Sequence, residues 1–212
     1  MKLWHCAGAR SLRPLWALEE MGLDYELHAM PFPPRMFERE YLQQNSLGTV
    51  PYFVDGDVIM TESAGICQYL VDRYKRYDFG LEPGHPEYGS YLNWLHHSDA
   101  TLTFPQTIVL RYTVLEPTES KKEVADDYAK WFISRLRRLD AHLEDHQYLV
   151  DNRFTIADVA IGYALYLGRV LKLDDAYKPQ TKSYLERLTE RAAFQRADAI
   201  REPGAATSPS LF

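Results

Sequence analysis

Hydrophobic and polar positions near the start of the chain predict two strands separated by a helix. Residues 2–6 and 25–30 form short runs of the kind that is typical of strands. Between them, apolar side chains recur at helical spacing up to Gly22, a residue type that commonly ends a helix. Two strands joined through a helix in one compact unit are expected to lie parallel, with a right-handed crossover. A short helix or irregular turn is expected next, over residues 35–42.

A hairpin and a helix are predicted between residues 45 and 76. Val50 precedes a proline, and the proline ring disfavours a helical conformation at Val50. Residues 52–54 and 58–60 then predict two short strands joined by a tight turn. The helix that follows begins with Thr-Glu-Ser, and its apolar side chains recur at helical spacing. This order of strands and helices is the layout of a thioredoxin-like domain.

Strand patterns disappear after residues 77–86, a stretch rich in glycine and proline that predicts a linker. Beyond it, residues 86–115 predict a long helix kinked at Pro105, and residues 118–146 predict another. In the second of these helices, five side chains are expected to face the core: Trp131, Ile133, Leu136, Leu139 and Leu143.

A capping box is predicted at the start of the next helix. Thr155 is expected to cap the helix, and Asp158 to reach back to the Thr155 backbone. This helix is predicted to run to about residue 170, followed by two shorter ones over 181–189 and 191–200. The second half of the chain is therefore expected to be all-helical.

The start of the helix after the hairpin has the chemistry of a receptor for a small peptide. Its unpaired N–H groups and the positive end of its dipole suit a carboxylate, and Glu62 can accept an ammonium group. The backbone N–H and C=O of Val50 can pair with another short peptide. A peptide with a free α-carboxylate and α-amine at one end satisfies all of these groups.

The stretch V-P-Y-F-V-D-G-D-V-I-M-T-E-S-A-G-I-C-Q-Y-L resembles the glutathione-binding segment of cytosolic glutathione S-transferases. The resemblance implies that Pro51 is cis and that the Val50 backbone pairs with the cysteinyl unit of glutathione. It also implies that Glu62 and Ser63 hold the γ-glutamyl end of this co-substrate.

The resemblance extends over nearly the whole chain and implies a fold of class α/β + all-α. We expect a thioredoxin-like, glutathione-binding domain at residues 1–76 and a linker at 77–86. An all-helical domain that lines the electrophile pocket is expected at residues 87–212.

The resemblance places the glutathione sulfur near the start of the first helix. Ser11, which is also predicted to cap this helix, can donate its hydroxyl to the sulfur, and Arg10 can add a positive charge. The segment Gly-Ala-Xaa-Ser-Leu looks most like bacterial beta-class members, but Arg10 stands where that class usually has a reactive cysteine. The activating tyrosine of the alpha, mu and pi classes falls at His5. Whether Ser11, Arg10, His5 or the backbone activates the thiol therefore stays open.

The electrophilic substrate is expected in an apolar pocket between the loop at residues 31–37 and the long helix. Four side chains of that helix are spaced to present one face: Phe104, Ile108, Arg111 and Tyr112. Arg111 in that pocket would suit an anionic substrate. In several classes of the family an acidic residue of this helix reaches the glutathione amine of the partner subunit, and Asp99 is the candidate here. The chain is accordingly expected to form a homodimer.

Composition excludes several other kinds of protein. The net charge is −6 with no long basic run, so nucleic acids and membrane surfaces are poor partners. No apolar stretch is long enough to span a bilayer, and the start lacks the core of a signal peptide. The two cysteines, Cys6 and Cys67, form neither a disulfide framework nor a zinc-ligand pattern, and no metal site is expected. We expect a cytoplasmic protein.

Together these features predict a detoxifying glutathione transferase that adds the glutathione thiolate to an apolar electrophile. A glutathione-dependent isomerase, lyase or dehalogenase on the same fold is the first alternative. The second alternative is a non-enzymatic protein that binds glutathione or another protein.

Overall fold

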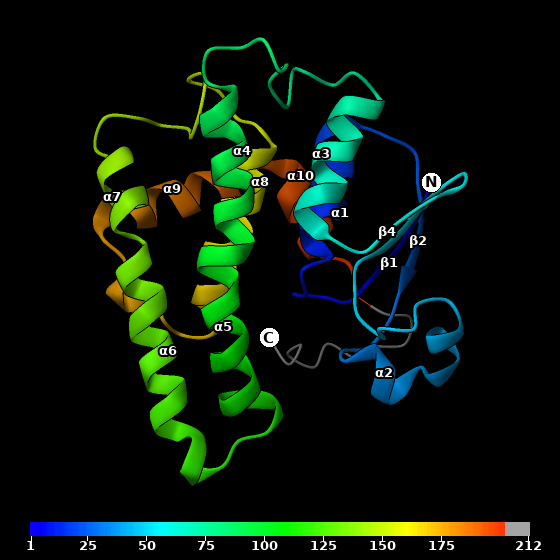
Figure 1. The fold of residues 1–212 in the computed structure, drawn as a ribbon, viewed down its shortest axis with the longest axis vertical. Helices are drawn as coiled ribbons and strands as arrows, with labels where there is room; N and C mark the ends of the chain where they lie inside the picture. The colour runs from blue at the N-terminus through cyan, green and yellow to red at the C-terminus, as the bar shows by residue number, and fades with distance from the viewer. Residues whose placement is uncertain (202–212) are drawn as a thin grey trace. The chain divides into compact units, whose positions relative to one another are not determined.

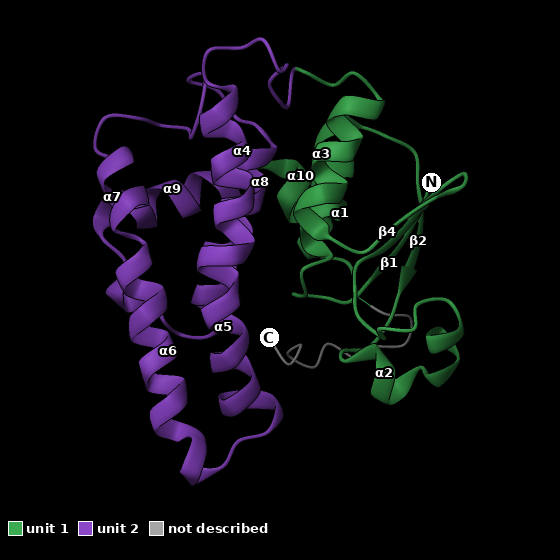
Figure 2. Cartoon of the chain, in the orientation of Figure 1, with its two compact units in different colours: residues 1–77, 190–212 green, residues 78–189 purple. Residues whose placement is uncertain are grey.

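The computed structural model describes residues 1–201, and residues 202–212 at the end of the predicted helical domain lie outside the described residues. The chain forms two compact units (Figure 2). Unit 1 comprises residues 1–77 and the described residues from 190 onward, and unit 2 comprises residues 78–189. The domain boundaries expected at residues 76 and 87 stay a prediction.

Unit 1 is built on a four-stranded sheet with the strand order β2-β1-β3-β4 (Figure 1). Its strands are β1 (Lys2–His5), β2 (Glu26–Ala29), β3 (Tyr52–Asp55) and β4 (Val58–Met60). β1 pairs in parallel with β2, as predicted from the helix between them, and antiparallel with β3. The hairpin of β3 and β4 turns at Gly56, whose φ of 59° is readily adopted by glycine.

Three longer helices belong to unit 1, and the first of them packs against the other two: α1 (Leu12–Met21), α3 (Ser63–Arg73) and α10 (Ala192–Asp198). A shorter helix, α2 (Pro34–Phe37), and a 3₁₀ turn, η1 (Arg39–Gln43), replace the single short helix expected over residues 35–42. The Trp16 ring of α1 meets Phe194 of α10 edge to face, with centroids 4.9 Å apart. α10 is thus an integral part of the unit that contains the sheet.

Unit 2 is all-helical, as predicted. Its long first helix runs through α4 (Tyr88–His97), η2 (Ser98–Thr103), α5 (Phe104–Leu110) and η3 (Arg111–Leu115). η2 and η3 are π-helical, and Pro105 lies in the first turn of α5, where it breaks no α-helical hydrogen bond of that helix. The remaining elements are η4 (Glu119–Lys121), α6 (Lys122–Arg135), α7 (Arg137–His142), α8 (Ile156–Val170), η5 (Asp174–Ala176) and α9 (Pro179–Thr189).

The prediction of a single helix over residues 118–146 is wrong in one respect. The helix breaks at Leu136 into α6 and α7. The prediction that Trp131 faces the core is also wrong. Trp131 is 40% exposed, whereas its neighbour Phe132 is fully buried. Phe132 lies four residues before the buried Leu136, so Phe132 shares the inner face and Trp131 is rotated away from it.

The capping box at the start of α8 is confirmed. The Thr155 hydroxyl accepts a bond from the Ala157 N–H at 3.3 Å, and the Asp158 carboxylate accepts one from the Thr155 N–H at 2.8 Å. The other carboxylate oxygen of Asp158 accepts bonds from the Leu149 N–H and the Tyr184 hydroxyl. Burial raises the pKa of Asp158 to about 6, although the hydrogen bonds that its carboxylate accepts favour the ionised form. Asp158 therefore ties α8 and α9 to the preceding loop.

Among the helices of residues 1–201, none combines the length and apolar character needed to cross a lipid bilayer.

Candidate active site

Val50 is held by the loop that precedes it. The Tyr41 hydroxyl and the Asn45 side-chain amide both donate to the carbonyl of Thr49, at 2.7 and 2.8 Å. Burial raises the pKa of Tyr41 to about 12, so this hydroxyl keeps its proton. Gly48 has a φ of 59°, and a Cβ there would lie 2.8 Å from the Cβ of Arg35, so glycine is required on both counts.

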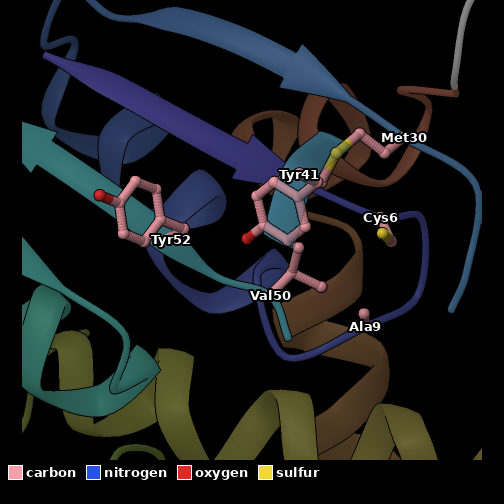
Figure 3. Packing of buried hydrophobic residues seen from close by; sticks show 6 residues of the cluster. All are labelled: Cys6, Ala9, Met30, Tyr41, Val50 and Tyr52. Carbon is pink, nitrogen blue, oxygen red and sulfur yellow. The ribbon is translucent and has the colours of Figure 1, made fainter. Parts of the chain in front are cut away.

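A small hydrophobic cluster fixes the Val50 side chain beside the end of β1. Figure 3 shows this cluster, which comprises Cys6, Ala9, Met30, Tyr41, Val50 and Tyr52. The Val50–Pro51 peptide bond is cis, as the resemblance implied. In the part of the chain that the structure describes, no backbone hydrogen bond uses the N–H or carbonyl of Val50. These two groups are therefore available to a peptide ligand.

The start of α3 lies in the same unit as Val50. Glu62 is the residue before the first helical position, and no described side chain caps the helix there. Ser63 is the first helical residue, and its hydroxyl accepts a 2.9 Å hydrogen bond from the guanidinium of Arg13. Arg13 lies in the first turn of α1 and is fully buried. The helix N–H groups and this guanidinium together make the start of α3 electropositive.

The turn between β1 and α1 contains Arg10 and Ser11, two of the candidates for thiol activation. The prediction that the Ser11 side chain caps α1 is wrong, because Ser11 itself has helical angles and makes no capping hydrogen bond. Its hydroxyl instead lies 2.9 Å from Nδ1 of His5 and accepts a 3.2 Å bond from the Cys6 N–H. Ser11 is fully buried, whereas Arg10 is partly exposed. The hydrogen bonds explain the orientation of Ser11, because they satisfy backbone and side-chain groups at the end of β1.

His5 lies beneath this turn and is almost completely buried. Burial lowers the pKa of His5 to about 4, a hydrogen bond with the Ser11 backbone opposes this change, and the positive charge of Arg201 adds to it. His5 is therefore neutral at pH 7. Its Nε2 atom is buried and has no hydrogen-bond partner among the described residues.

The predicted substrate-pocket residues and Asp99 all lie in the long helix of unit 2. Phe104 is 47% exposed and meets Tyr128 and Trp131 of α6 edge to face, with centroids 6.2 Å apart in each pair. Ile108 and Tyr112 are partly buried. The Arg111 guanidinium donates two hydrogen bonds, of 3.1 and 3.0 Å, to one carboxylate oxygen of Glu116. Asp99 is partly buried in the π-helical segment η2.

Sequence reasoning missed two residues that support this site. Tyr41 could not be predicted from the local pattern, because it supports the site through a hydrogen bond to the carbonyl of Thr49, eight residues later. Arg13 left a usable signal: it is a charged residue among Leu12, Pro14 and Leu15 at the start of an apolar helix. An arginine placed there is a candidate for burial, and a buried arginine needs hydrogen-bond partners.

Within residues 1–201 there is no group of three or more His, Cys, Asp or Glu side chains that could hold a metal ion. Both cysteines are buried, and neither forms a disulfide. The site as described therefore consists of backbone groups, hydroxyls and charged side chains.

Comparisons with known proteins show which family the chain belongs to. Residues 1–72 match the family model "Glutathione S-transferase, N-terminal domain", and residues 101–192 match "Glutathione S-transferase, C-terminal domain". Glutathione S-transferase 1 of Zea mays is 28% identical over 97% of this chain and 99% of the relative. Glutathione S-transferase GstA of Escherichia coli O157:H7 is 27% identical over 96% of this chain and 99% of the relative.

Solved structures give the same result for the fold. The ternary complex of BphK, a bacterial glutathione transferase, superposes with a TM-score of 0.81 at 25% identity, over 93% of this chain and 98% of that one. A sphingomonad glutathione S-transferase complexed with glutathione has a TM-score of 0.80 at 24% identity, over 93% of this chain and 97% of that one. Because the two family models cover most of the sequence and these relatives match along its length, the chain belongs to the glutathione S-transferase family.

Proposed function

We propose that this glutathione transferase binds its co-substrate along Val50 and at the start of α3, and adds the thiolate to an apolar electrophilic carbon. The backbone of Val50 pairs with the cysteinyl unit, beside the cis bond to Pro51. Ser63 and the N–H groups of α3 bind the γ-glutamyl carboxylate, and Glu62 accepts the γ-glutamyl ammonium.

This proposal rests on hydrogen-bonding groups at two places in unit 1, at Val50 and at the start of α3. The N–H and carbonyl of Val50 take no backbone hydrogen bond from the described residues, although the loop before Val50 is tightly held. The start of α3 has no side-chain cap from those residues either. Groups that are rigid and unsatisfied are suited to a ligand, because little ordering is needed on binding.

Thiol activation is proposed for the turn between β1 and α1. Arg10 is partly exposed there, so its charge can stabilise a thiolate directly. Ser11 stays a candidate, but its buried hydroxyl would have to leave Nδ1 of His5 to reach a bound sulfur. Measuring the pKa of enzyme-bound glutathione in Ser11→Ala separates these roles. A large rise in that pKa would assign the contact to Ser11, and an unchanged pKa would assign Ser11 to the structure of the turn.

The electrophile is proposed to lie against the face of the long helix that carries Phe104, Ile108 and Tyr112. These side chains offer apolar and aromatic surface, of which Phe104 is the most exposed. Arg111 favours an anionic substrate only if its guanidinium leaves the Glu116 carboxylate and pairs with the substrate instead. Activity of Arg111→Ala on matched acidic and neutral electrophiles tests this role, because a selective loss on the acidic compound is expected.

Calorimetry and a conjugation assay test the proposed function. Glutathione is expected to bind, and Glu62→Gln to weaken binding by about tenfold through loss of one charge-assisted interaction. Glu82→Gln, a change at another exposed carboxylate, is the matched control. Turnover of a chlorinated nitroaromatic with glutathione is expected in the same preparation. Absence of binding at millimolar glutathione would refute the proposal.

We further propose that the chain acts as a cytoplasmic homodimer in which Asp99 reaches the glutathione amine of the partner subunit. The partly buried position of Asp99 in η2 is compatible with such a contact. Sedimentation of the protein is expected to give twice the chain mass. If a dimer forms, Asp99→Asn is expected to raise the glutathione KM. A purely monomeric, active protein would exclude this role.

A further inference from the structure

Two arginines of unit 2 form no ion pair with an acidic side chain. Arg135 ends α6 and Arg138 lies in the first turn of α7, and both side chains are exposed. Neither pairs with a carboxylate among the described residues, whereas Lys130, on the same helix as Arg135, pairs with Asp127. The chain as a whole has a net charge of −6, so a general excess of basic residues does not explain them.

Each of the two guanidinium groups lies over a tryptophan ring. The central carbon of the Arg135 guanidinium is 5.5 Å from the ring centroid of Trp131. The same carbon of Arg138 is 5.1 Å from the centroid of Trp94. A guanidinium stacked on a ring uses its planar face and keeps the N–H groups at its edge for hydrogen bonds. These two cations are therefore oriented by contacts that leave their donors available to an oxyanion.

His97, at the end of α4, lies beside one of these tryptophans. Its ring meets Trp94 edge to face, with centroids 5.6 Å apart, so His97 and Arg138 contact the same side chain. The Nε2 atom of His97 is buried and has no hydrogen-bond partner in the part of the chain that the structure describes. Burial lowers the pKa of His97, and the positive charges of Arg138 and Arg135 lower it further. Three side chains from α4, α6 and α7 thus share one region of positive potential.

We propose that His97, Arg135 and Arg138 form a binding site in unit 2 for the phosphoryl group of a small molecule. The two guanidinium groups donate to its oxygens, and the oxyanion supplies the partner that Nε2 of His97 lacks. A phosphoryl dianion suits this site better than a carboxylate, because it matches two positive charges and offers three acceptor oxygens. The inference does not depend on where glutathione binds.

NMR titration of the histidine resonances tests the site. The wild type is titrated with inorganic phosphate, with glycerol 3-phosphate and, at the same ionic strength, with acetate. Both phosphoryl compounds are expected to shift the His97 resonances saturably and to raise the pKa of His97, because a bound dianion stabilises the imidazolium. Acetate is expected to do neither. Tighter binding of glycerol 3-phosphate would identify a phosphomonoester as the ligand and tighter binding of phosphate the free ion, and either order supports the site.

Arginine variants show whether the proposed side chains make the contacts. Arg135→Met and Arg138→Met are each expected to weaken phosphate binding about tenfold, as for loss of one charge-assisted interaction. Arg169→Met is the matched control, because Arg169 also belongs to unit 2 and lies over an aromatic ring, that of Tyr166. This control is expected to bind phosphate as tightly as the wild type.

Three results would overturn the inference. The first is acetate that shifts the His97 resonances as strongly as phosphate, and the second is wild-type phosphate affinity in both Arg135→Met and Arg138→Met. The third concerns a second copy of the chain, whose acidic side chains could cover the arginines. If the wild type binds no phosphate and these two variants lose a dimer seen by sedimentation, the arginines belong to a subunit interface. Should one variant not fold, the other gives the same test.

Discussion

Acidification is expected to destabilise the folded chain through His5. The buried ring has a folded-state pKa of about 4, well below the 6.5 of a histidine in an unfolded chain. Between these two values the unfolded chain binds a proton at His5 and the folded chain does not. Stability therefore rises with pH across this range, and it is lost as the pH falls from about 6.5 toward 4. Above pH 6.5 this residue makes no pH-dependent contribution.

The size of the effect follows from the two pKa values. Between pH 7 and pH 5, protonation of His5 in the unfolded chain lowers the free energy of unfolding by about 2 kcal/mol. Two partly buried histidines also contribute to the total pH dependence, because partial burial lowers the pKa values of His97 and His142. A difference between the wild type and a His5 variant isolates the contribution of His5.

The assay is urea unfolding of the wild type and His5→Asn at a series of pH values from 7 to 5. His5→Asn is expected to be less stable at pH 7, where it loses packing and the bond with Ser11. The stability difference is expected to shrink by about 2 kcal/mol at pH 5, because the variant has no proton to gain. His96→Asn, at an exposed position of α4, is the control and is expected to leave the wild-type slope unchanged. A wild-type-to-His5→Asn difference that stays constant with pH would refute the reasoning.

Three further predictions concern the capping box, the loop before Val50 and the thiol. Thr155→Ala is expected to lower the free energy of unfolding by about 1–2 kcal/mol through loss of the cap, as measured by urea unfolding against Thr107→Ala. Gly48→Ala is expected to weaken glutathione binding and to lower the melting temperature, because positive φ and the Arg35 contact both oppose a Cβ; unchanged binding would contradict this. Arg10→Ala is expected to raise the pKa of bound glutathione by about one unit, as followed by thiolate absorbance, whereas Arg39→Ala should not.

Much of the fold could be predicted because local signals and packing agree. The parallel pairing of β1 and β2 follows from the helix between them, and the hairpin turn follows from Gly56. The capping box at Thr155 and Asp158 was predictable because all of its atoms lie within one helical turn. The burial of Trp131 was predicted wrongly, because apolar character alone does not separate a buried position from an exposed one a single residue away.

The candidate site was predictable only where its groups are close in sequence. Glu62, Ser63, Val50 and Pro51 belong to one stretch with a recognisable order. The contact from Arg13 to Ser63 joins residues fifty positions apart, and no local pattern specifies such a pairing. Ser11 illustrates the converse: a serine before a helix is a usual cap, but here the neighbouring groups of His5 and Cys6 compete successfully for its hydroxyl.

The return of α10 to unit 1 has a consequence for synthesis of the chain on the ribosome. Trp16 packs against Phe194, and Glu20 and Glu19 of α1 form ion pairs with Arg191 and Arg196. A nascent chain that has emerged only as far as residue 77 would contain all four strands of the sheet but not α10. The surface of α1 that α10 covers would therefore stay exposed to solvent. Packing of unit 1 can therefore be completed only when almost all of the polypeptide has been translated. This interval is when a holdase chaperone would find apolar surface to bind.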